Sequence, residues 1–123
     1  MTRTAAAQVF GEDTTVLLHQ LAACASPPSL VAGGMLSLTI TVPPDAGGAL
    51  RRAVLRAEAV LLRREADDVA DGALRPPSCH ARQASAVQMV ARAVAERARL
   101  HGLRGQTVAE RALLHGTLTV SPP

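Results

Sequence analysis

Two long segments of the sequence repeat their apolar residues at helical spacing, and they constrain the fold more than any other feature. In residues 46–71 the repeat is Leu50, Val54, Ala57 and Leu61, widened by Ala53 and Val60. In residues 78–101 it is Ala84, Val87, Ala91, Val94, Ala98 and His101. Gly72 and Pro76-Pro77 separate the two segments, because glycine and proline end helices. We therefore expect two long helices with one apolar stripe each. In the first helix, we expect arginines and acids to occupy the positions outside the stripe.

Alanine occupies every second position of the stripe in the second segment. Small side chains let two helix backbones approach closely, so this helix is expected to pack against the 46–71 helix. The connection of about six residues suits helices that run in opposite directions. The sequence therefore predicts an antiparallel helical hairpin.

Shorter helices are expected on either side of this hairpin. The first covers residues 14–25, with Asp13 or Thr14 as its N-cap and Pro27-Pro28 as its stop. The last begins at Thr107, because Thr107 and Glu110 form a T-x-x-E capping box. Gly116 is expected to end that helix.

Two strand segments, residues 30–32 and 35–42, flank Gly33-Gly34. A two-residue glycine link predicts a hairpin, because both turn positions need a positive φ. Alternation places Leu36, Leu38, Ile40 and Val42 on one face. With a third strand at 117–120, we expect a small antiparallel sheet with one face on the helices and edges that a second subunit could cover. The expected fold is mainly α, in the α+β class, as one small domain over residues 1–123.

Composition excludes several function classes. Phe10 is the only aromatic residue, so the core must be aliphatic, and stacking platforms for nucleic-acid bases or aromatic interface anchors are disfavoured. All 13 basic residues are arginine, which indicates a GC-rich bacterial genome rather than a function. The apolar run at 30–42 is too short to span a bilayer, so no membrane partner is expected.

Cysteine usage is typical of a cytoplasmic protein, because Cys24 and Cys79 lie far apart and form no CxxC motif. A disulfide between them stays open. Cys79 and His80 are adjacent on a helix and point to different faces, which argues against a nucleophile and base pair, although His101 could approach from elsewhere. The histidines and cysteines lack the spacing of a zinc site, so neither a metal nor a cofactor is expected.

The basic charge gathers in the C-terminal third, where residues 94–115 resemble a helix-turn-helix motif. Ala98 would allow close crossing, Gly102 would make the turn, and Thr107 would open the second helix. The resemblance implies nucleic-acid contacts by Arg99, Arg104, Gln106, Thr107 and Arg111. It is partial, because Arg97, His101 and Arg111 stand where the motif has apolar residues.

Two further patterns suggest ligands. Gly47 and Gly48 open a helix directly after a strand, with Arg51 and Arg52 in its first turns, so exposed amides and arginine charge predict a weak anion site. Residues 67–71 resemble the DDxxD magnesium-diphosphate motif of isoprenoid synthases, and Glu65 with Asp68 resembles half of the motif of all-helical nucleotide pyrophosphohydrolases. The chain is too short for the first family and lacks the second family's upstream carboxylate cluster, so a solvated acidic helix end is preferred.

No catalytic constellation emerges from these patterns, so an enzyme is the less favoured reading. The sequence favours a non-enzymatic regulatory or assembly module that acts through protein contacts, as a homodimer or other homo-oligomer. The alternative is a DNA-binding transcriptional regulator that uses residues 94–115.

Overall fold

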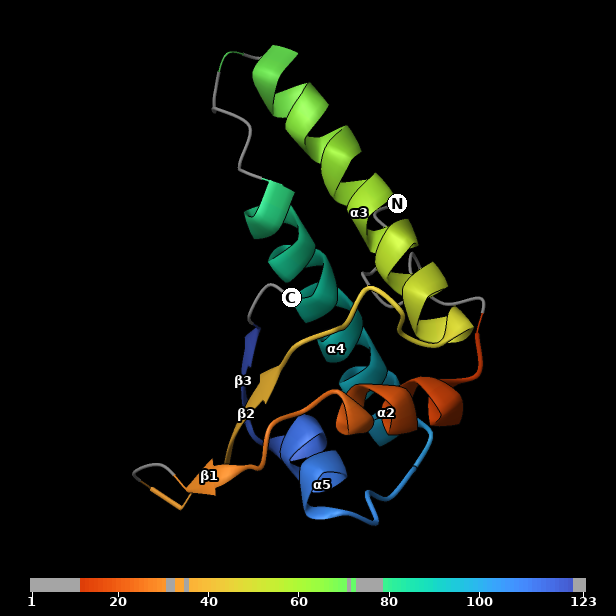
Figure 1. Ribbon diagram of the computed structural model, residues 1–123, viewed down its shortest axis with the longest axis vertical. Helices are drawn as coiled ribbons and strands as arrows, with labels where there is room; N and C mark the ends of the chain where they lie inside the picture. Colours follow the sequence, from red (N-terminus) through yellow and green to blue (C-terminus); the bar gives the residue numbers. More distant parts are fainter. Residues whose placement is uncertain (1–11, 31–32, 35, 71, 73–78, 121–123) are drawn as a thin grey trace.

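A computed structural model describes residues 12–30, 33–34, 36–70, 72 and 79–120 of the chain (Figure 1). Within these residues the elements are α2 (Thr14–Ala23), β1 (Ser29–Leu30), β2 (Leu36–Ile40), α3 (Gly48–Ala70), α4 (Cys79–Leu100), α5 (Val108–His115) and β3 (Thr117–Val120). The predicted mainly α architecture with a small β component is confirmed. None of the described helices is long and apolar enough to cross a membrane.

The two long helices form the predicted antiparallel hairpin, and their contact is the most extensive between any two elements (Figure 1). The expected stripe of α3 is buried at Leu50, Ala53, Val54 and Ala57. Beyond Ala57, no described side chain of α3 is fully buried. We call residues 58–70 of α3 and Gly72, with residues 79–85 of α4, the arm, and the remaining described residues the base. Figure 1 shows the arm extending past the base.

Helix α4 is the central element of the base, in contact with α2, α3, α5 and β3. The prediction of one stripe was too narrow, because it assumed one partner. The structure also buries Ala86, Val90, Ala93 and Ala95. His101, placed in the predicted stripe, follows the end of α4 and is exposed. Small side chains on several sides of α4 allow this many neighbours to approach it.

The sheet has the order β1-β2-β3 and is mixed rather than antiparallel. Strands β1 and β2 pair antiparallel as predicted, with Ser29 opposite Ser37. Strands β2 and β3 pair parallel, with Leu38 opposite Leu118, so the antiparallel prediction was wrong for β3. The reason is the path between them, because α3, α4 and α5 return the chain to β2 in the direction in which it left (Figure 1).

Local signals in the first half of the chain are largely confirmed. Gly33 and Gly34 both have a positive φ, of +85° and +77°, as predicted. However, Leu30 pairs with Leu36, so five residues separate the paired strand ends and the register does not fit the predicted two-residue turn. The alternation of β2 and its extension buries Leu38, Ile40 and Val42. Predictions that fall on residues 31–32, 35, 71 and 76–78 lie outside the described residues.

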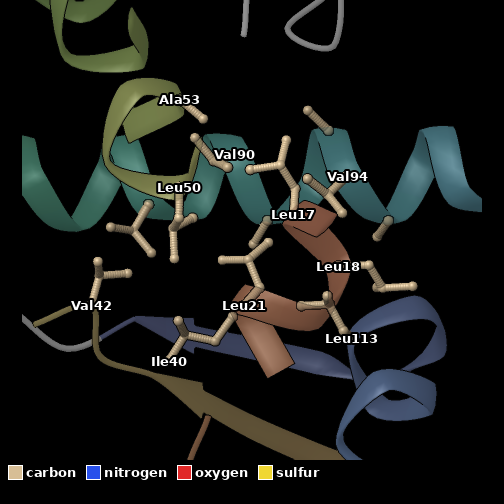
Figure 2. Close-up of a cluster of buried hydrophobic side chains, with 14 of the residues drawn as sticks. Leu17, Leu18, Leu21, Ile40, Val42, Leu50, Ala53, Val90, Val94 and Leu113 are labelled. Carbon is tan, nitrogen blue, oxygen red and sulfur yellow. The ribbon is translucent and has the colours of Figure 1, made fainter. Parts of the chain in front are cut away.

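The core lies where α2, β2, α5 and the first half of α3 meet α4, and its large side chains are aliphatic (Figure 2). Its fully buried large members are Leu17, Leu18, Leu21, Leu38, Ile40, Leu50, Leu113, Val90 and Val94. Each such side chain contributes roughly 1.5–3 kcal/mol when it leaves water. In α2 the buried face consists of Leu17, Leu18 and Leu21, while Val16 is exposed.

Candidate functional site

One side of α3 carries apolar residues that stay exposed in the described structure. Leu55, Ala59, Leu62 and Ala66 are all exposed, the two leucines by 52% and 46%. Their spacing of 4, 3 and 4 places them along one side of the helix, opposite the buried stripe that begins at Leu50. We call these four residues the outer face. Sequence reasoning missed it, because it assigned the positions outside the first stripe to arginines and acids.

Charged residues of opposite sign flank the outer face. Arg56 and Arg63 directly follow its two leucines, whereas Glu58 and Glu65 directly precede its two alanines. One border of the stripe is therefore cationic and the other acidic. Apolar residues alternating at three and four positions between charged flanks are the pattern of a coiled-coil contact. This spacing is the signal by which the sequence itself would have revealed the face.

Two of these four charges are used inside the chain. Arg56 donates from Nη2 to Oε1 of Glu12 at 3.1 Å, and Glu65 pairs with Arg82 of α4, with Nη2 to Oε2 at 2.9 Å. Within the described residues, no ion pair involves Glu58 or Arg63. Glu58 and Arg63 are therefore the two flanking charges that form no ion pair among the described residues.

Glu12 holds the approach to α2 against the side of α3. Its carboxylate also accepts a hydrogen bond from Arg52, with Nε to Oε1 at 2.7 Å. Hydrogen bonds from Arg52 and then Arg56 lower the pKa of Glu12 to about 2. Glu12 is thus ionised at neutral pH and offsets part of the arginine charge on this part of α3.

The residues predicted to contact DNA lie at different places around α5. Arg99 donates to the carbonyl of Leu114 at 2.5 Å, near the C-terminal end of α5. Gln106 and Thr107 lie at its N-terminal end, where the Thr107 hydroxyl accepts the N–H of Glu110 at 3.0 Å. Arg104 and Arg111 are exposed on the loop and on α5. Gln106, Thr107 and Arg111 lie close together in the N-terminal half of α5, where the N–H of Arg111 donates to the Thr107 carbonyl at 3.0 Å. Arg99 contacts the other end of the helix.

Glu110 is the one charged side chain that the described part of the chain buries. Its carboxylate lies 2.8 Å from Nδ1 of His19 on α2 and accepts the N–H of Gln106 at 3.0 Å. Burial works to raise the pKa of Glu110, but the hydrogen bonds with Gln106, His19 and Thr107 outweigh it and lower the pKa. All these partners belong to the fold, so Glu110 joins α5 to α2 rather than serving as a free acid or base.

The predicted anion site at the start of α3 is filled by groups of the chain itself. Arg51 donates to the carbonyl of Pro44 at 2.6 Å, and Arg52 is held by Glu12. The side chain of Gln20 accepts the N–H of Leu50 at 2.9 Å, which satisfies one amide of the first turn. Gly47 allows this cap, because a Cβ there would lie 2.9 Å from Nε2 of Gln20, and Gly48 follows it. An anion at this site would have to compete with Glu12.

Thiol and metal chemistry gain no support from the described residues. Cys24 is a free thiol, and burial raises its pKa, which disfavours the reactive thiolate. The side chains of Cys79 and His80 lie outside the described part, as does Asp71 of the acidic motif. Among the described residues, no group of three histidine, cysteine or acidic side chains could hold a metal ion.

A groove of about 590 Å³ lies between α4, α5 and β3. Arg92, Glu96 and Arg99 line it on α4, and Leu118 lines it on β3. Its charges are of both signs, and Arg99 is already bonded to Leu114. The lining therefore offers no single ligand chemistry.

No protein-family model matches the chain, and neither a curated protein nor a solved structure matches it.

Proposed function

We propose that this protein is a non-enzymatic assembly module that forms a homodimer through the outer face of α3. The observation that carries the proposal is the exposed pair Leu55 and Leu62, one heptad apart, with Ala59 and Ala66 between and beyond them. Scattered exposed leucines are ordinary on a protein surface. Four apolar residues at a and d spacing match the contact surface of a coiled coil over two heptads.

The packing of α3 against α4 favours a role of α3 in dimerisation. Helix α3 packs along α4, and the ion pair between Glu65 and Arg82 joins the two helices within the arm. A helix that is already ordered loses little conformational freedom when it binds. The outer face is small, so we expect a dimer whose population depends on protein concentration.

Sedimentation equilibrium over a concentration series tests the proposal. The wild-type chain should approach twice the monomer mass as its concentration rises, whereas Leu62→Glu should stay monomeric. Leu100→Glu is the matched control, because Leu100 is also exposed, by 77%, but lies at the end of α4. This control should dimerise like the wild type, and circular dichroism should show the same helix content in all three proteins.

A wild-type chain that is monomeric at every concentration would overturn the proposal. A variant that lacks residues 1–11 distinguishes a dimer partner from the chain's own N-terminal segment as the occupant of the outer face. If only this variant dimerises, the outer face is covered by the chain's own N-terminal segment, and self-assembly of the full chain is rejected. A loss of dimer in Leu100→Glu equal to that in Leu62→Glu would also reject the assignment to α3.

DNA binding through residues 94–115 is a second proposal, supported by the turn between α4 and α5. Gly102 has a φ of +67° two residues after the end of α4, and Thr107 caps α5, as in a helix-turn-helix. Duplex binding should fall steeply with added salt, and Arg111→Ala should weaken it. An absence of duplex binding at low salt rejects this alternative.

A further inference from the structure

We infer that the two α3 helices of the dimer run parallel, because the charges that border the outer face are complementary only in that direction. This inference rests on the proposed homodimer and names its geometry. It commits to a second copy of this chain as the occupant of the outer face. The direction of the two helices decides which flanking charges meet across the dimer.

The heptad positions follow from the spacing of the outer face. The two leucines take the d positions and the two alanines take the a positions, so Arg56 and Arg63 stand at e, and Glu58 and Glu65 stand at g. In a parallel pair, a g residue faces the e residue five positions further along the partner helix. Glu58 then faces Arg63 of the partner subunit, and the twofold symmetry of the dimer makes this ion pair twice.

The antiparallel arrangement brings like charges together. In that arrangement e positions face e positions and g positions face g positions. Arg56 would meet Arg63 of the partner subunit, and Glu58 would meet Glu65 of the partner subunit. Like charges in contact oppose association, so the borders of the outer face select against this direction.

The charges near Glu58 and Arg63 do not reverse the preference for the parallel direction. In the parallel arrangement Arg51 would face Arg56 of the partner subunit. However, Arg56 is paired with Glu12 of its own chain, and the guanidinium of Arg51 is bonded to the Pro44 carbonyl. Glu65 is engaged by Arg82. Glu58 and Arg63 are therefore the pair that decides the direction.

Charge reversal tests the direction separately from dimerisation. Glu58→Arg and Arg63→Glu should each raise the dimer dissociation constant roughly fivefold to thirtyfold, because two attractive contacts become two repulsive ones. The double variant Glu58→Arg/Arg63→Glu should return close to the wild-type value. Arg92→Glu is the control, because it reverses one arginine on the exposed side of α4 and should leave the constant unchanged.

Mixing the two single variants gives the sharpest readout. In a parallel heterodimer, the guanidinium introduced by Glu58→Arg faces the carboxylate introduced by Arg63→Glu. The second contact joins the unchanged Arg63 of the first variant to the unchanged Glu58 of the other, so both contacts are attractive. The mixture should therefore dimerise more tightly than either variant alone. In an antiparallel dimer, the mixture would give an average of the two.

Two results would overturn the parallel direction while leaving the homodimer intact. One is a tighter dimer for Arg63→Glu, which the antiparallel arrangement predicts because the new carboxylate would face Arg56 of the partner subunit. The other is a dissociation constant that neither reversal changes. A wild-type chain that does not dimerise at all would instead reject the proposed function.

Discussion

The base and the arm of this protein are built from the same two long helices but bury their side chains to different extents. In the base, α4 is covered by α2, α3, α5 and β3, and residues such as Leu50 and Val94 are fully buried. In the arm, α3 beyond Ala57 has no fully buried side chain within the described residues. Figure 1 shows why, since the sheet and the short helices lie beside the base only. The difference teaches that a helix can extend past the elements that cover it, and that its side chains beyond them stay at the surface of the described structure.

A pair of leucine truncations tests this contrast with the largest expected effect. Leu21→Ala should lower the free energy of unfolding by about 2–5 kcal/mol, because Leu21 is fully buried and its removal leaves a cavity. Leu62→Ala should change it by less than about 0.5 kcal/mol in the monomer, because Leu62 is half exposed. Urea unfolding at low protein concentration measures both. Equal losses for the two variants would show that the arm is as deeply packed as the base.

A substitution at Gly116 tests how closely the backbone is packed in the base. A Cβ at this position would collide with the carbonyl oxygens of Leu36 and Ala112. Because backbone atoms must then move, Gly116→Ala should cost about 1–3 kcal/mol of unfolding free energy. Gly48→Ala is the control, since its Cβ would meet only the flexible end of Arg52. A thermal melt of Gly116→Ala that matches the control would show that this corner of the base is loosely packed.

Glu110 and Glu65 each join two helices through their carboxylates, and they allow a second comparison of base and arm with a smaller expected effect. Glu110→Gln in the base should cost about 1.5 kcal/mol, because the carboxylate is buried and bonded to His19 and Gln106. Glu65→Gln in the arm should cost less than about 1 kcal/mol, because its pair with Arg82 is partly exposed. Denaturant unfolding of both variants ranks them. The reverse order would mean that the arm, rather than the base, depends on its ion pair.

The smallest expected effect concerns pH. Glu12 has a pKa of about 2 in the folded chain, below its ordinary value of 4.5, so its contribution to stability is complete above pH 4.5 and is lost as the pH falls toward 2. Glu12→Gln should therefore show a shallower fall of the melting temperature between these two pH values. A slope that remains comes in part from Glu110, whose pKa is also lowered. Identical slopes in the wild type and the variant would exclude Glu12 as a source of acid sensitivity.

The sequence predicted those features of the fold that depend on residues close together in the chain. The cap at Thr107 and the positive φ at Gly33 and Gly34 depend on local backbone geometry, and the structure confirms them. The direction of β3 depends on the path of three helices, which no local pattern contains. The contact between His19 and Glu110 joins positions 91 residues apart, so no spacing rule indicates it.

The outer face is a different kind of omission, since its spacing was present in the sequence. Two apolar stripes lie on opposite sides of α3, and the fuller one, from Leu50 to Leu61, predicts only the side that packs. The second stripe contains only two large residues, Leu55 and Leu62, among arginines and acids. Only the exposure of these leucines in the folded chain separates the side that packs from the side that does not.

The parallel pairing of β2 with β3 has a consequence for the order in which the chain folds during synthesis. Ser37 pairs with Thr117, so β2 leaves the ribosome long before its neighbour exists. The α3–α4 hairpin needs only residues close in sequence and can form early, whereas contacts between distant residues form slowly. Until residues 117–120 have been synthesised, the growing chain carries β2 with one side unpaired, which is the state most open to wrong association.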